Sequence, residues 1–61
     1  MDTIVAYGCG FLDAMRLLKV GEYTSPFVTL DKTTYTIKDH ELEAYYKGCA
    51  DAVAQYRGVK P

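Results

Sequence analysis

The sequence predicts an α+β fold in which two antiparallel helices are joined by a short β-hairpin or extended segment. Residues 2–19 and 39–57 contain no proline and repeat apolar residues at helical spacing. Residues 22–38 are rich in Thr, Val, Tyr and Phe, which favour extended structure. Small residues recur at every fourth position of both predicted helices, so the helices are expected to pack closely. With 61 residues, the chain is expected to form a single small domain, residues 1–61.

The ends of the two helices follow from capping residues. We expect the first helix to stop at Gly21, because glycine readily takes the left-handed conformation that ends helices. Asp39 is the predicted N-cap of the second helix, and Glu41 lies near the positive end of its dipole. Arg57 and Gly58 are suited to its close.

The segment between the helices contains two candidate strands. Residues 27–30 and 33–37 flank Asp31 and Lys32, and this order predicts a hairpin. The turn lacks the Asn-Gly or Asp-Gly pair that favours tight hairpins. A loop with one short strand, or a single helical turn begun by Ser25 and Pro26, is therefore an alternative.

An internal repeat is the most informative feature. The pattern Ala-Tyr-x-x-Gly-x-x-Asp-Ala occurs at residues 6–14 and again at residues 44–52. Glycine inside a helix costs about 1 kcal/mol relative to alanine, so Gly10 and Gly48 indicate close backbone contact, with a chance occurrence of small residues at these positions as the alternative. In antiparallel helices the two glycines would lie opposite each other. The predicted helix–helix groove consists of Ala6, Gly10, Ala14, Ala44, Gly48 and Ala52.

Few residues are suited to chemistry. Cys9 and Cys49 lie at one level of the predicted pair, but Cys9 turns away from the groove, so we expect two reduced thiols, with a disulfide or a metal site as alternatives. His40 stands between two acids, yet consecutive helical residues point about 100° apart and do not converge on one ion. No Ser or Cys has the sequence neighbourhood of a nucleophile. We therefore expect no enzyme activity, no cofactor and no metal.

Some large side chains fall outside the predicted core. Val5 and Leu12 lie on a third side of the first helix, and Tyr23 lies in the connector. Exposed apolar atoms are common on small domains, but tyrosine is also enriched at the centres of protein interfaces. The predicted partner interface consists of Val5, Leu12, Arg16 and Tyr23.

The charge balance disfavours two classes of partner. The net charge is −1 and the seven basic residues are scattered, whereas nucleic-acid binding needs clustered cations. No apolar run has the length of a membrane span, and the first residues lack the basic start of a secretory signal. We therefore expect a cytoplasmic protein.

One resemblance to a family bears on function. Residues 10–18 (Gly-Phe-Leu-Asp-Ala-Met-Arg-Leu-Leu), followed by Ser25-Pro26 and Val-Thr-Leu at 28–30, resemble the opening of the small Tai-type immunity proteins of type VI secretion. The resemblance covers under half of the chain and implies an exported, mostly helical protein.

Together, these features predict a small module that occupies a site on a larger protein or complex. One form would be an inhibitor of a host defence system, encoded by a phage or mobile element. The alternatives are a structural homo-oligomer that packs through the small-residue grooves, and a small immunity-type protein.

Overall fold

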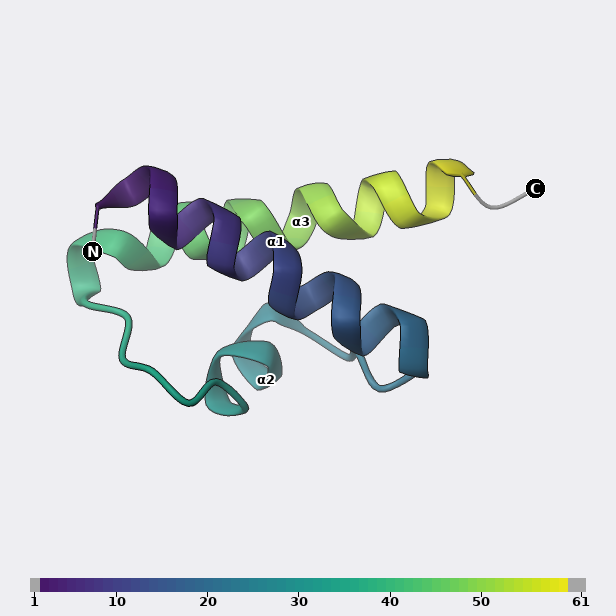
Figure 1. The fold of residues 1–61 in the computed structure, drawn as a ribbon, viewed down its shortest axis with the longest axis horizontal. Helices are drawn as coiled ribbons and strands as arrows, with labels where there is room; N and C mark the ends of the chain where they lie inside the picture. The colour runs from purple at the N-terminus through teal and green to yellow at the C-terminus, as the bar shows by residue number, and fades with distance from the viewer. Residues whose placement is uncertain (1, 60–61) are drawn as a thin grey trace.

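Two long helices dominate the structure. The computed structural model describes residues 2–59 and contains α1 (Thr3–Val20), α2 (Pro26–Asp31), a 3₁₀ turn η1 (Asp39–Glu41) and α3 (Leu42–Val59). Helices α1 and α3 cross near their middles, while α2 and the loop after it lie along one side of the pair (Figure 1). Across residues 2–59 the fold is helical and contains no strand.

The prediction of an α+β fold with antiparallel helices is wrong. Helices α1 and α3 run in the same direction along the molecule (Figure 1). Thr3, at the start of α1, accordingly lines one cleft together with His40 of η1 and Ala44 near the start of α3. The connection between the helices therefore returns along the length of the pair, which a tight hairpin turn would not do.

The predicted β-hairpin is replaced by a helical turn because local capping overrides strand propensity. The hydroxyl of Ser25 accepts a hydrogen bond from the backbone N–H of Val28 at 3.2 Å, and Pro26 occupies the first turn of α2. Thr29 is buried and donates its hydroxyl to the carbonyl of Ser25 at 3.0 Å. A lone two-stranded hairpin is only marginally stable, so packing as a helical turn prevails.

The end of α1 is as predicted, and its start is capped. The carboxylate of Asp2 accepts from the backbone N–H of Val5 at 2.8 Å. Gly21 has φ 75°, in the left-handed region, and its N–H donates to the carbonyl of Leu18. The predicted stop at Gly21 is confirmed.

The start of α3 differs from the predicted N-cap at Asp39. Asp39 already lies inside η1, and Glu41 fixes this turn instead. The carboxylate of Glu41 accepts from the backbone N–H of Lys38 at 3.1 Å, and its own N–H donates to the carbonyl of Lys38 at 2.8 Å. The bond from the Lys38 backbone also lowers the pKa of Glu41, whose side chain is buried.

The core lies along the crossing of α1 and α3. It is built around Tyr45 and Cys49 of α3, with small residues of both helices and Ile37 of the loop. Partly buried apolar side chains surround it: Cys9, Phe11, Met15, Leu18, Tyr23, Leu30, Tyr35, Leu42 and Tyr46. The loop before η1 thus contributes to the core without forming a strand.

Candidate functional site

The small-residue positions meet where α1 crosses α3. Ala6, Gly10 and Ala14 are buried on α1. Gly48 and Ala52 are buried on α3, while Ala44 is half-buried. Because the helices are parallel, the two series run in the same order and not in the reversed order of an antiparallel pair.

The two glycines make reciprocal contacts. A Cβ atom on residue 10 would overlap the carbonyl oxygen of Tyr45, and one on residue 48 would overlap the carbonyl oxygen of Tyr7. Tyr7 and Tyr45 hold the same position in the two copies of the repeat. Each glycine therefore packs against the backbone of the other copy's tyrosine, as in an approximate twofold arrangement.

The tyrosines and aspartates of the repeat are paired in the same reciprocal way. The hydroxyl of Tyr7 donates to Asp51, and the hydroxyl of Tyr45 donates to Asp13 at 3.0 Å. The bond to Asp51 raises the pKa of Tyr7. Sequence reasoning missed these pairs, although the repeat itself contained the signal: Tyr and Asp recur in it with the same spacing as the small residues.

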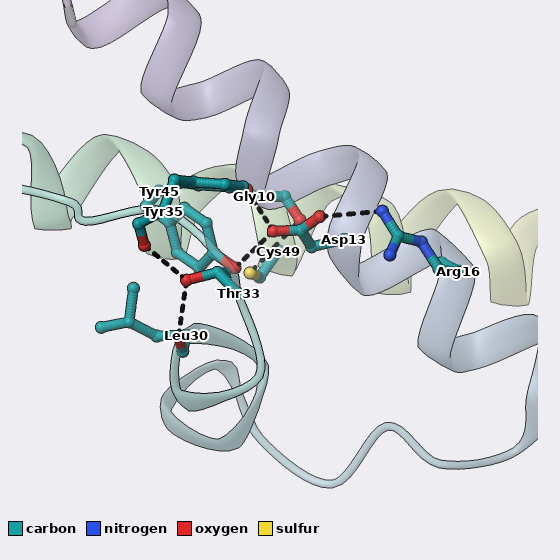
Figure 2. Close-up of polar contacts among 8 residues, drawn as sticks. All are labelled: Gly10, Asp13, Arg16, Leu30, Thr33, Tyr35, Tyr45 and Cys49. Carbon is teal, nitrogen blue, oxygen red and sulfur yellow. Dashed lines mark hydrogen bonds and ion pairs between the residues drawn. The ribbon is translucent and has the colours of Figure 1, made fainter.

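Further side chains surround the pair formed by Tyr45 and Asp13. Figure 2 shows Asp13 between the hydroxyl of Tyr35, which donates to it, and the guanidinium of Arg16, at 3.3 Å. The hydroxyl of Thr33 is shared between the carbonyl oxygens of Leu30 and Tyr35, at 3.0 and 2.8 Å, which holds the loop in this position (Figure 2). Burial, followed by the bond to Asp13, raises the pKa of Tyr35.

The two halves of the repeat differ in what covers them. On α3, Tyr46 is half-buried and its ring packs edge-on against Phe27 of α2, with centroids 5.2 Å apart. In the register of the repeat, Ile4 of α1 corresponds to Leu42 of α3, and Gly8 corresponds to Tyr46. Ile4 is 81% exposed, and a Cβ on residue 8 would meet no atom within 4 Å. The place that α2 covers on α3 therefore has a counterpart on α1 that nothing in the described residues covers.

Three of the four predicted interface residues lie on the solvent side of α1. Val5 is exposed, Leu12 is 66% exposed, and the Arg16 side chain is 75% exposed. We call the surface formed by the exposed side chains of Ile4, Val5 and Leu12, together with the half-buried Gly8 between them, the outer face of α1. Arg16 lies one turn beyond Leu12 on this side.

Tyr23 does not join the other three interface residues. It is half-buried and packs against the core, and burial raises the pKa of its hydroxyl. Sequence reasoning placed it outside the core because it lies in a connector. The tertiary fold brings that connector back against the helices.

The thiols and the histidine do not form a chemical centre. Cys9 and Cys49 are free thiols, and that of Cys49 is buried and donates to the carbonyl of Gly10 at 3.4 Å. Burial raises the pKa of Cys49 to about 11, so this thiol is a poor nucleophile at neutral pH. His40 is exposed, with Nε2 3.6 Å from Oε2 of Glu41. Residues 2–59 hold no group of three or more His, Cys, Asp and Glu side chains placed to bind a metal ion.

Comparisons of the chain with protein-family models, with curated proteins and with solved structures found no match. Among the described residues, neither long helix has the length and apolar character needed to cross a lipid bilayer.

Proposed function

We propose that this chain is a protein-binding module that acts by occupying a site on a larger protein, with the outer face of α1 as its docking surface. The observation that carries the proposal is the unequal cover of the repeat. Tyr46 packs under Phe27, whereas Ile4 and Gly8, at the corresponding places on α1, are uncovered. Contiguous exposed apolar side chains on a small protein favour a role in protein contact.

The covered half indicates the chemistry of the partner. On that half, Phe27 supplies an aromatic ring and Tyr35 supplies a hydroxyl for Asp13. On the open half, Gly8 leaves room for an apolar side chain, and within the described residues one hydroxyl, that of Tyr7, donates to Asp51. The proposed partner therefore presents a short apolar helical segment together with a hydrogen-bond donor or cation for Asp51.

Charge also favours a partner with acidic residues at one end of this segment. Arg16 and Lys19 follow the apolar part of the outer face along α1, and both are exposed. Carboxylates on the partner would meet them, which would speed association and fix its orientation.

A site-specific photo-crosslink tests the proposal. Benzoylphenylalanine replaces Leu12 in cells that naturally contain the protein, and the matched control places it at Ala50, the exposed residue in the corresponding place on α3. We expect position 12 to crosslink to one protein and position 50 not to do so. With that protein purified, Ile4→Ala and Leu12→Ala should each weaken binding about fivefold or more, with the helical circular dichroism unchanged.

Two outcomes would contradict this function. One is equal crosslinking from positions 12 and 50, which would show that contact is not specific to the outer face of α1. The other is crosslinking only to a second copy of the chain, which would make the face a self-association surface. The small-residue series is not available for such a dimer, because it is buried between α1 and α3 of one chain.

A further inference from the structure

A cavity of about 270 Å³ opens between α1 and the end of α2. Asp13 and Arg16 line it from α1, and Lys32, Thr33 and Thr34 line it from the chain after α2. It is smaller than pockets that hold drug-sized ligands, so its volume suits a single small group.

The hydrogen-bond acceptors around this cavity are already engaged. Asp13 accepts from Tyr35, Tyr45 and Arg16 (Figure 2). The last carbonyls of α2 accept as well: those of Val28 and Thr29 from the N–H of Lys32, and that of Leu30 from the N–H and the hydroxyl of Thr33. The carboxylate in the cavity lining, that of Asp13, thus already has three donors directed at it.

The donors, in contrast, have capacity left. A guanidinium has five N–H donors, and the structure shows one nitrogen of Arg16 on Asp13. The ammonium of Lys32 lies 3.6 Å from the carboxylate of Glu22, in an exposed pair that contributes little energy. Unused donors that belong to two cations attract an anionic acceptor, and the planar guanidinium can hold two of its oxygens at once.

We propose that this cavity is a binding site for a small oxyanion, a phosphate or a carboxylate, held between Arg16 and Lys32. The Thr34 side chain, exposed at the edge of the cavity, supplies a further hydroxyl. The site is complete within one chain. It shares Arg16 with the charged end of the docking surface proposed above, whereas Lys32 belongs to this site and Leu12 to that surface, so Lys32→Gln and Leu12→Ala test the two proposals separately.

An NMR titration of the ¹⁵N-labelled full chain tests the site. Sodium phosphate and, separately, sodium acetate are added at constant ionic strength, with sodium chloride as the balancing salt. We expect saturable shifts of the backbone amides of Thr33 and Thr34, with a dissociation constant on the order of 1 mM. Saturation by both salts supports a general oxyanion site, and saturation by phosphate alone supports a phosphate site.

Charge-removing variants complete the test. Arg16→Gln and Lys32→Gln should each weaken binding about tenfold, whereas Lys47→Gln, on the exposed side of α3, should leave it unchanged. Lys32→Gln keeps the test valid if Arg16→Gln disturbs the contacts of Asp13, because Lys32 is exposed and contacts Glu22 instead. Shifts that rise linearly with either salt, or that are the same in the wild type and both variants, would overturn the proposal.

Discussion

Gly10 lies directly against the carbonyl oxygen of Tyr45, at a distance that leaves no room for a Cβ atom. Gly48 lies in the same way against the carbonyl oxygen of Tyr7. Both obstructing atoms belong to the helix backbone and cannot rotate away as a flexible side chain could. The crossing of α1 and α3 therefore depends on two residues that lack a side chain.

Replacing either glycine with alanine, the smallest possible change, should destabilise the fold. Gly10→Ala and Gly48→Ala are each expected to cost about 2 kcal/mol, because the helices must move apart. Gly8→Ala is the matched control, because Gly8 lies in α1 like Gly10 but has open space where a Cβ atom would be. Alanine at position 8 should raise the free energy of unfolding by about 0.5–1 kcal/mol. Chemical denaturation followed by circular dichroism measures all three. Equal stabilities of Gly8→Ala and Gly10→Ala would contradict the close crossing.

Asp13 and Asp51 have equivalent places in the repeat but different numbers of partners. Asp13 accepts from two tyrosine hydroxyls and Arg16, whereas Asp51 accepts from the hydroxyl of Tyr7. Asp13→Asn should therefore cost about 2 kcal/mol and Asp51→Asn less than about 1 kcal/mol. The free energy of unfolding of the two variants tests this difference. A larger loss for Asp51→Asn would show that the enclosed cluster does not stabilise the fold.

The free energy of unfolding should fall at alkaline pH, because a buried thiol and a buried phenol ionise less readily in the folded chain than in the unfolded one. Burial raises the pKa of Cys49 from 9.0 to about 11, so above pH 9 the thiol ionises in the unfolded chain while it stays protonated in the folded one. Its contribution is thus complete below pH 9 and is lost as the pH rises toward 11. The loss is on the order of 1–3 kcal/mol. Tyr45, whose pKa burial also raises, adds to the loss above pH 10.

Urea denaturation between pH 7 and pH 11 measures this loss. Cys49→Ala should flatten the decline where it begins, just above pH 9, and Cys9→Ala should retain it. A free energy of unfolding that stays constant over the whole range would contradict the burial of these groups.

Tyr23 and Leu12 should respond differently to truncation. Tyr23→Ala removes a ring that packs against the core and should cost about 1–3 kcal/mol. Leu12→Ala, at a largely exposed position, should change the free energy of unfolding by no more than about 0.5 kcal/mol. Thermal unfolding of the two variants compares them directly. Loss of stability in Leu12→Ala, with none in Tyr23→Ala, would reverse their assignment to surface and core.

The sequence by itself determined the two long helices and their small-residue contact. The stop of α1 at Gly21 follows from the backbone preference of glycine. Gly10 and Gly48 indicate close packing, because glycine is otherwise costly inside a helix. The outer face of α1 was also foreseen in part: Val5 and Leu12 are exposed, as their place on the helix predicts. All of these features depend on residues that are near one another along the chain.

The direction of the helices and the path between them were decided only by the tertiary structure. A series of small residues packs equally well in either direction, so the repeat does not distinguish parallel from antiparallel helices. Strand propensity in residues 27–37 was overridden because Ser25 caps α2 and because Tyr35 reaches Asp13, 22 positions earlier in the chain. Long-range contacts of this kind also bring Tyr23 to the core. They leave no pattern in the local periodicity of the sequence, because they depend on the free energy of the whole fold.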